Sequence, residues 1–231
     1  MPTSPAKIQR GMSQQLHTWR ETMTKQDHRL GWKIGFNMQA DQQRLSLPSA
    51  MVGYLSRQRT LLSGQHYQTS ANAILLVEPE IAVQIHCDVP AGASIEQANS
   101  AIAAYTAALE LIDTTRSVGD DIEAILGGNL FHESVVLAES RISPANYARE
   151  QLAFSLHLNG EEVRTLEQER VPQDFSTLII DTANILAEHG EQLQAGDWII
   201  TGAAAKPVPV QAGDDISLDM QHLGQITLNL K

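Results

Sequence analysis

The sequence predicts an α+β protein that forms one compact unit. Residues 12–23 and 174–188 repeat apolar side chains every three or four positions, as helices do, whereas most other apolar segments are short or alternate, as strands do. Residues 196–231 contain only short strand patterns separated by turns. A chain of 231 residues can bury a large core in a single domain, and no repeat or Pro/Gly/Ser-rich linker divides it.

Composition and charge exclude several classes of protein. The 16 basic and 27 acidic residues give a net charge of −11, which offers no surface for nucleic acid and repels an anionic membrane. No apolar run reaches the ~18 to 20 residues that span a bilayer, and the N-terminus lacks a signal-peptide core. The single cysteine, Cys87, excludes an internal disulfide framework and fits a reducing compartment. We expect a cytoplasmic protein that binds neither nucleic acid nor a membrane.

The N-terminal third begins with a helix and continues with strands. In the helix of residues 12–23, one apolar face packs on the core. Residues 31–37 form a strand that starts at a glycine. The polar residues 38–48 indicate a short helix and a loop before a strand at 51–55, and we interpret this stretch as a candidate lid or entrance segment.

The middle of the chain alternates apolar and polar residues and then becomes rich in alanine. Residues 73–89 predict one long strand, or two joined by a bulge, and Cys87 takes an inert strand position there. Ser94 and Gln97 form a capping-box pattern that starts a helix, and the alanine-rich stretch predicts that the helix continues to Ala108.

The remaining elements are short and bounded by turns. The Asn159-Gly160 pair is a strong hairpin signal after a strand at 152–159, and Gly190 ends the helix of residues 174–188. The other predicted elements are a helical turn at 122–126, a buried strand at 134–137, and strands at 198–201 and 226–230.

Three glutamates in two apolar segments are the strongest indication of function. Glu78 and Glu80 lie two apart in the run 77–83, so on a strand both carboxylates point to one face and repel each other unless a cation lies between them. Glu110 lies in the apolar run 107–112, where a carboxylate is rarely buried unless it is paired or bound to a metal. Such oxygen ligands suit Mg²⁺. The alternative for Glu78 and Glu80 alone is the solvated face of a half-exposed sheet.

Four motifs follow one another along the chain. They are G-W-K-I-G at 31–35, the two glutamate segments at 77–83 and 108–113, G-D-W-I-I-T-G at 196–202, and P-V-P-V-Q-A-G-D at 207–214. In this order they resemble the fumarylacetoacetate hydrolase superfamily, and within it the branch of 2-keto-4-pentenoate hydratases and 4-oxalocrotonate decarboxylases. The resemblance covers nearly the whole chain.

The resemblance implies a mixed β-roll with flanking helices, a divalent metal (Mg²⁺ or Mn²⁺) and a small 2-oxo or 2-hydroxydienoic acid as the substrate. It places the metal ligands on Glu78, Glu80 and Glu110, in agreement with the carboxylate pattern. Residues 66–231 are then the catalytic β-roll, and residues 1–65 are an N-terminal helical and strand region with the entrance segment. A homo-oligomer is the default expectation.

The resemblance also gives roles to Lys33, Thr201 and Gly202. Lys33 matches the lysine of the branch. From the local pattern its side chain points either to solvent or into a cleft, and in a cleft it would orient the substrate carboxylate or transfer a proton. Thr201 and Gly202 match a substrate-side turn whose hydroxyl and backbone would bind the substrate carboxylate. The alternative for this turn is an ordinary strand end.

Residues 128–134 depart from the branch. Members carry an Asp-Asn-Ala-Ser type segment there, so Asn129 is retained as a substrate-binding candidate but the aspartate before it is missing. His132 is a candidate catalytic residue that would replace a lost proton-transfer group, with a hydrogen-bonded packing histidine as the alternative. Asp113 is either a secondary ligand or the cap of the next helix. The N-terminal region is also shorter than in typical members.

These observations favour a metal-dependent lyase, a hydratase that adds water to a 2-hydroxy-2,4-dienoate to give a 4-hydroxy-2-oxo acid. Decarboxylation of a 2-oxo-3-enedioate uses the same ligands, so the ligand set does not separate the two reactions. Hydrolysis of an acylpyruvate is a third option, and no serine or cysteine nucleophile elbow is present. The alternative of a different class is a non-catalytic paralogue that serves as a structural partner of an active subunit.

Overall fold

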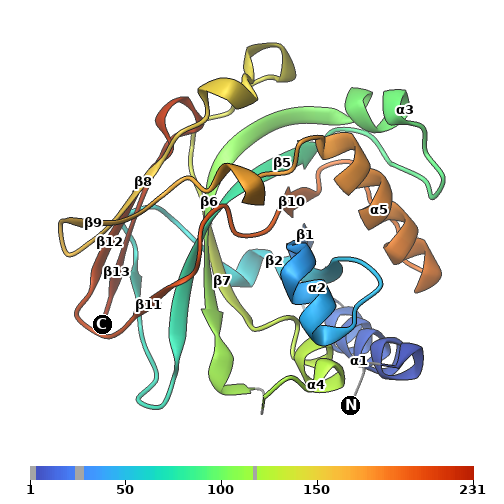
Figure 1. The fold of residues 1–231 in the computed structure, drawn as a ribbon, viewed down its shortest axis with the longest axis horizontal. Helices are drawn as coiled ribbons and strands as arrows, with labels where there is room; N and C mark the ends of the chain where they lie inside the picture. The colour runs from blue at the N-terminus through green and yellow to red at the C-terminus, as the bar shows by residue number, and fades with distance from the viewer. Residues whose placement is uncertain (1–3, 24–28, 117–118) are drawn as a thin grey trace.

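The computed structural model describes residues 4–23, 29–116 and 119–231, which form two β-sheets flanked by helices (Figure 1). The larger sheet is mixed, because β1 runs parallel to β10 and β3 runs parallel to β7, whereas the other pairs are antiparallel. In spatial order it contains β2 (Met51–Ser56), β1 (Arg29–Gly35), β10 (Trp198–Ile200), β5 (Leu75–Ile85), β6 (Ile102–Asp113), β7 (His132–Leu137) and β3 (Thr60–Leu61), and β11 (Val208–Val210) pairs with β5.

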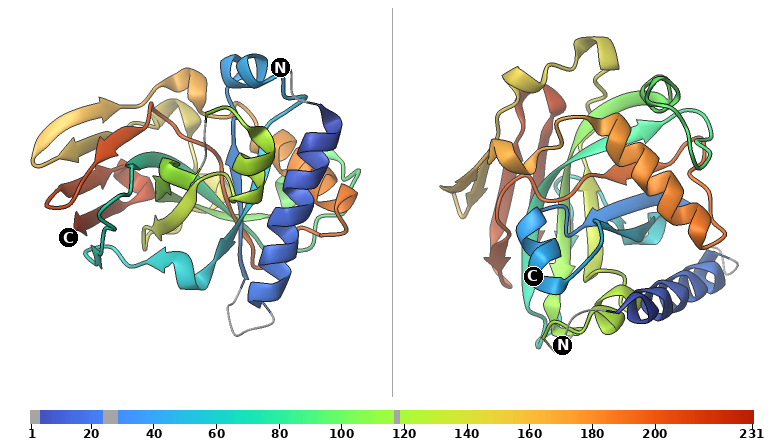
Figure 2. Two further views of the ribbon diagram at one scale, coloured as in Figure 1. Left: turned by 90° about the horizontal axis from the view of Figure 1, so that it is seen from below. Right: turned by 45° about the vertical axis from the view of Figure 1, so that its right-hand side comes forward.

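The smaller sheet forms the opposite wall of the molecule (Figures 1 and 2). Its strands, in spatial order, are β4 (His66–Tyr67), β13 (Gln225–Leu230), β12 (Asp215–Asp219), β8 (Ser155–Leu158) and β9 (Glu161–Thr165). The β8–β9 hairpin turns at Asn159 and Gly160, whose φ angles are 54° and 84°. Positive φ at both central residues is the requirement of a type I′ turn, so the hairpin predicted from Asn159-Gly160 is confirmed.

The helices pack in two groups on the larger sheet. Helix α1 (Pro5–Met23) lies along α4 (Ile122–Gly127), and α3 (Ile95–Ser100) packs against α5 (Phe175–Glu188), as Figures 1 and 2 show. Helix α2 (Gln39–Leu45) follows β1. The apolar face of α1 is buried at Met12, Leu16 and Trp19, as the periodicity predicts. In the described part of the chain, no helix combines the length and apolar character that crossing a membrane requires.

Short 3₁₀ turns connect several of these elements. They comprise Arg57–Arg59, Thr114–Arg116, Pro144–Asn146, Arg149–Gln151, Gln168–Arg170 and Gln221–Leu223. The mixed sheets with flanking helices confirm the predicted α+β fold with a mixed β-roll.

Two predictions about the middle of the chain are wrong. The alanine-rich stretch is not helical beyond Ser100: residues Ile102–Asp113 form β6, which pairs with β5 on one side and β7 on the other. The high helix propensity of alanine is a weak preference, and pairing in the centre of a sheet overrides it. Cys87 is exposed and lies beyond the end of β5, so it does not occupy a strand.

Asp197 fixes the position of β1 against β10. Its carboxylate accepts hydrogen bonds from Arg29 Nε (2.6 Å) and from the indole Nε1 of buried Trp32 (3.1 Å). This bonding links the G-W-K-I-G motif to the G-D-W motif, whose strands pair with Lys33 opposite Ile200. The contacts between the two motifs therefore fix the strand that carries Lys33.

Candidate active site

The three glutamates converge on one face of the β5–β6 ribbon. Glu78 is paired directly with Glu110 across the two strands, and Glu80 follows two residues later on the same face. Each residue offers one carboxylate oxygen, and these oxygens all lie within 4.8 Å of one another. Glu80 and Glu110 are fully buried, whereas Glu78 is half-buried. The predicted convergence of the three carboxylates is present in the structure.

A break in strand pairing beside β5 brings the backbone of residues 201–207 to this site. β10 and β11 pair with the two ends of β5, and the chain between them forms no regular ladder but stays bonded to the carbonyls of Pro79 and Ile81. The Pro79 carbonyl accepts a hydrogen bond from Ala204 N (2.8 Å). In a strand the nitrogen and the carbonyl of one residue point to the same side, so the Pro79 nitrogen, which carries no hydrogen, faces the same segment. A proline fits here because no regular strand needs its donor at this edge.

Protein groups satisfy only half of the buried carboxylate oxygens. Glu80 Oε2 accepts from the backbone N–H of Gly202 (2.7 Å). Glu110 Oε1 accepts from Lys33 Nζ (2.5 Å) and lies 2.6 Å from His132 Nδ1. Glu80 Oε1 and Glu110 Oε2 are buried and have no hydrogen-bond partner among the described residues. Such atoms are costly to bury, and a cation between the carboxylates would compensate for them.

Electrostatics agree with a missing positive charge. Burial, reinforced by Glu110, raises the pKa of Glu78 to about 7, although Lys33 and more weakly Arg170 oppose the rise. Burial and the two neighbouring carboxylates raise the pKa of Glu80 well above its usual range. Burial would also raise the pKa of Glu110, but Lys33 and His132 together outweigh it and lower the value. When all three carboxylates are ionised, the charge of one lysine leaves two negative charges for a divalent cation to balance.

The donor set therefore fits a hard divalent cation. Carboxylate oxygens are the ligands that Mg²⁺, Mn²⁺ and Ca²⁺ prefer, and the two unpartnered buried oxygens point to a site that the protein alone does not complete. Glu78, Glu80 and Glu110 are the residues that would hold the ion. No other group of three or more possible ligands with this spacing occurs in residues 4–23, 29–116 and 119–231.

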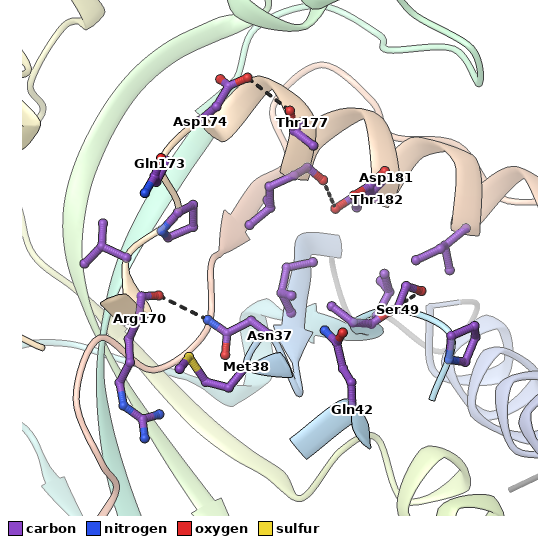
Figure 3. A pocket seen from close by; sticks show the side chains of 18 of the residues that line it. Asn37, Met38, Gln42, Ser49, Arg170, Gln173, Asp174, Thr177, Asp181 and Thr182 are labelled. Atoms are coloured by element: carbon purple, nitrogen blue, oxygen red, sulfur yellow. Dashed lines mark hydrogen bonds between the residues drawn. The ribbon is translucent and has the colours of Figure 1, made fainter. Parts of the chain in front are cut away.

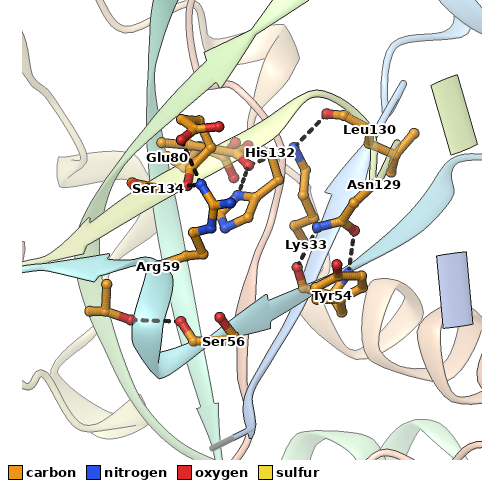
Figure 4. Close-up of polar contacts among 12 residues, drawn as sticks. Lys33, Tyr54, Ser56, Arg59, Glu80, Asn129, Leu130, His132 and Ser134 are labelled. Carbon is orange, nitrogen blue, oxygen red and sulfur yellow. Dashed lines mark hydrogen bonds and ion pairs between the residues drawn. The ribbon is translucent and has the colours of Figure 1, made fainter. Parts of the chain in front are cut away.

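Lys33 lies in the cleft and not in solvent, which resolves the alternatives left open by the sequence. It is 2% exposed, pairs with Glu110, and donates to the carbonyl of Leu130 (3.0 Å). Figure 4 shows Lys33, Glu80 and His132 approaching one another from separate strands. Because Glu110 is held by both Lys33 and His132, the charges at the buried end of the site are fixed by mutual contacts.

The Leu130 carbonyl is presented by a strained turn. Asn129, Leu130 and Phe131 have φ angles of 60°, 52° and 64°, so three consecutive residues other than glycine are left-handed. Each such residue costs on the order of 1 kcal/mol or more, and runs of this kind persist only where the surroundings impose them. The Asn129 side chain supplies this constraint, because it accepts from Tyr54 N (2.8 Å) and donates to Tyr54 O (2.9 Å).

His132 contacts the ligand set but lies away from the pocket that contains Lys33. Burial lowers its pKa below the usual value, although Glu110 opposes the shift, so the ring is neutral at pH 7. A neutral imidazole carries one N–H, and here Nδ1–H donates to the Glu110 carboxylate. The other ring nitrogen, Nε2, has no hydrogen-bond partner in the described chain. The ring lines a separate polar pocket of about 360 Å³ together with Asn129 and Arg59.

Thr201 and Gly202 contact β5 at Glu80 and at the residue after it. The Thr201 hydroxyl donates to the Ile81 carbonyl (3.0 Å), and the Gly202 N–H is taken by Glu80. Gly202 has a φ of 92°, and a Cβ at this position would lie 2.6 Å from the side chain of Asn37, so only glycine fits here. The substrate-binding roles of Thr201, Gly202 and Asn129 stay predictions.

A pocket of about 370 Å³ opens over Lys33 and Glu78. Leu76 and Ile112 lie two residues from Glu78 and Glu110 on the same strands, so the sheet face continues as an apolar wall. The other lining residues are mostly apolar as well, and the charged ones are Lys33, Asp41, Glu78 and Arg170.

A larger pocket of about 610 Å³ adjoins the first and shares Ile34, Asn37 and Arg170 with it (Figure 3). Met38, Gln42 and Pro48 line it, so the predicted entrance segment does border a cavity next to the site. Arg170 is not predictable as a pocket residue from the sequence, because the charged stretch 167–170 has the pattern of a solvated turn.

Asp113 does not join the glutamates. Three residues beyond Glu110 on a strand, its side chain falls on the opposite face. Its Oδ1 accepts from Thr115 N (3.0 Å) and Ile74 N (3.3 Å), which caps the turn Thr114–Arg116. Of the two roles that the sequence allowed for Asp113, the structure supports the cap.

The fold and the site together define a class of protein in which a mixed β-roll carries three converging carboxylates beside a buried lysine, a donor set that fits a divalent cation. Residues 25–231 match the family described as fumarylacetoacetate (FAA) hydrolase C-terminal, and the chain belongs to this family. The predicted superfamily is thereby confirmed.

The chain is similar to 4-oxalocrotonate decarboxylases both in sequence and in structure. It is 24% identical over 204 residues to 4-oxalocrotonate decarboxylase from Pseudomonas sp. (strain CF600), covering 86% of this chain and 76% of that one. The crystal structure of 4-oxalocrotonate decarboxylase from Pseudomonas putida G7 with magnesium and adipate has a TM-score of 0.87 and 23% identity, covering 94% and 83% of the two chains. The same enzyme with calcium and acetate gives a TM-score of 0.86, again at 23% identity, with the same coverage.

Proposed function

We propose that this protein is a divalent-metal-dependent lyase that decarboxylates a 2-oxo-3-enedioate. The observation that carries the proposal is the pair of buried, unpartnered oxygens on Glu80 and Glu110 beside the buried Lys33. The decarboxylase was the second option from the sequence. It now replaces the hydratase as the preferred reaction, because the similar proteins described above are decarboxylases whose structures hold magnesium or calcium.

The chemistry divides between the ion and the chain. When bound, a divalent cation supplies Lewis acidity at the carboxylate and 2-oxo oxygens of the substrate. Glu78, Glu80 and Glu110 would hold the ion, and Lys33 places a positive charge next to the 2-oxo end of the substrate, where negative charge collects during the reaction. In the reaction the bond to the distal carboxylate breaks, CO₂ leaves, and the electron pair passes through the conjugated chain to the 2-oxo group. Lys33 stabilises this charge or returns a proton.

The pocket wall favours loss of CO₂ over addition of water. Leu76, Ile112 and Phe131 face the space over Glu78 and Lys33. A carboxylate becomes neutral as CO₂ leaves, so an apolar wall favours the change in charge. Addition of water needs a positioned base near the distal carbon. Two acidic residues line the pocket, but Glu78 is one of the proposed metal ligands and Asp41 is paired with Arg44 at 3.4 Å, so neither is positioned as this base.

The experiment compares two substrates with one preparation. Purified protein with Mg²⁺ is supplied with 2-oxo-3-hexenedioate or with freshly generated 2-hydroxypenta-2,4-dienoate, and CO₂ release and ultraviolet absorbance are followed. We expect CO₂ from the diacid and slow or no loss of the dienoate. Turnover of the dienoate alone would establish the hydratase instead. A protein that binds Mg²⁺ but turns over neither would favour the non-catalytic paralogue.

A further inference from the structure

Arg170 lies where the two pockets meet, at the end of the 3₁₀ turn Gln168–Arg170. Its backbone carbonyl accepts from Asn37 Nδ2 (3.3 Å), so the turn is tied to the segment that follows β1. Figure 3 shows the side chain extending away from the labelled residues of α5. Arg170 therefore lines both pockets, with its side chain directed away from α5.

Within the described chain, one side chain, Glu167, pairs with the guanidinium of Arg170. Arg170 Nε lies 2.5 Å from Glu167 Oε2, and Glu167 Oε1 accepts from Lys206 N (2.9 Å), which fixes the acidic partner to the backbone. Among the described residues, the two Nη groups of Arg170 have no hydrogen-bond partner, and the side chain is 16% exposed. An arginine with a fixed Nε and unused Nη groups is prepared to bind a carboxylate or similar anion.

Arg170 differs in this respect from the other cation of the pocket. Lys33 is already engaged by Glu110 and the Leu130 carbonyl at the buried end. Both cations line the smaller pocket, whose wall is apolar at Leu76 and Ile112. A ligand with its polar head at the glutamates would therefore extend along an apolar wall and meet a second positive charge at Arg170.

We propose that Arg170 receives the second carboxylate of the substrate and so makes the site selective for 2-oxo diacids over 2-oxo monoacids. This inference rests on the proposed function, because it needs the 2-oxo acid end to lie at the glutamates.

The Glu167 pair sets how strongly Arg170 holds its ligand. A carboxylate loses its charge on the way to CO₂, so a cation that binds it tightly stabilises the substrate more than the transition state. Partial neutralisation by Glu167 reduces this effect. Arg170 is therefore a specificity-determining residue that acts on binding and not on the chemical step.

The test uses two ligands of equal length that differ in one carboxylate. Binding of 2-oxoadipate and of 2-oxohexanoate to the Mg²⁺-loaded protein is measured by calorimetry. We expect 2-oxoadipate to bind at least ~10-fold more tightly, the size of a charge-assisted contact. In Arg170→Gln this preference should disappear while the affinity for 2-oxohexanoate stays unchanged, and Arg170→Lys should retain part of it.

Arg164→Gln is the matched control, because Arg164 contacts the backbone of Val163 and Lys206 and lines none of the three pockets described above. Its preference should equal that of the unmodified protein. Unchanged binding of 2-oxohexanoate to Arg170→Gln also shows that the variant is folded.

The outcomes separate this inference from the proposed function. If neither ligand binds the Mg²⁺-loaded protein, the proposed function fails. If both bind with equal affinity, or if the preference survives in Arg170→Gln, the role of Arg170 is wrong while the metal site stands. With a diacid that is turned over, Arg170→Gln should raise KM about as much as Kd and leave kcat within about twofold. A fall in kcat at unchanged KM would overturn the assignment.

Discussion

The two ends of the candidate site are built differently. At the buried end Glu80, Glu110 and Lys33 are almost inaccessible, and each contacts other protein groups. At the open end Glu78 is half-buried, and Arg170 uses one of its nitrogens. The buried end therefore has fixed charges and positions, as reacting groups require, whereas the open end retains unused hydrogen-bonding capacity for a ligand.

The largest expected effect comes from removing a buried carboxylate charge. Glu80→Gln should weaken Mg²⁺ binding by ~10² or more and abolish metal-dependent turnover, since losing a ligand exceeds the loss typical of an outer partner. Without metal at pH 8, the melting temperature of the variant should equal or exceed that of the unmodified protein. The substitution replaces one of three mutually repelling carboxylates with a neutral amide. Calorimetric titration with Mg²⁺ and thermal unfolding measure both effects.

Glu133→Gln is the control for this variant, because Glu133 is also a largely buried carboxylate but binds Arg59 and Tyr67. It should lose stability and retain Mg²⁺ affinity. A fully active Glu80→Gln protein would exclude Glu80 as a required ligand and would remove the contrast between the two ends.

The second effect tests whether the charge at the buried end serves the reaction. Lys33→Met keeps most of the volume of the side chain and deletes its charge and proton. We expect kcat to fall by ~10² or more with little change in Mg²⁺ affinity, which is usual for one positioned acid–base or electrostatic group. Steady-state kinetics at saturating Mg²⁺ provide the measurement. An increase in KM alone would mean that Lys33 binds the substrate and the transition state equally well. Lys33 would then act in binding, as the open end does.

The smallest effect is a dependence of metal binding on pH. The pKa of Glu78 is raised to about 7, so between its ordinary value and about 7 the folded metal-free protein keeps a proton that the unfolded chain releases. The stability of the metal-free protein should therefore fall as pH rises through this interval. The cation competes with this proton, so its affinity should weaken by ~10-fold per pH unit below about 7.

Melting temperatures with and without Mg²⁺ at several values between pH 5.5 and 8 measure this dependence. The stabilisation by Mg²⁺ should be small at the acidic end and largest at pH 8. A shift that is equal at every pH would show that the carboxylates are already ionised, and that burial does not act on Glu78 as described.

Much of the site follows from local sequence patterns. The spacing of Glu78 and Glu80 in an apolar run places both carboxylates on one face of any strand, and the apolar neighbours of Glu110 predict its burial. These features need only the geometry of a strand and the cost of burying a charge. The helices of residues 12–23 and 174–188 and the Asn159-Gly160 turn were predicted for the same reason, since each depends on contacts between residues close in sequence.

Only the tertiary structure decided the rest. The alanine-rich residues 102–108 have the local preference of a helix, and pairing with two distant strands makes them part of β6. Lys33 faces the glutamates because β1 packs beside β10, and Arg170 reaches the pocket because a 3₁₀ turn lies beside the segment after β1. The alternation of a strand gives two faces but does not say which one meets a ligand. That choice depends on contacts between residues far apart in the chain, which propensity and spacing do not encode.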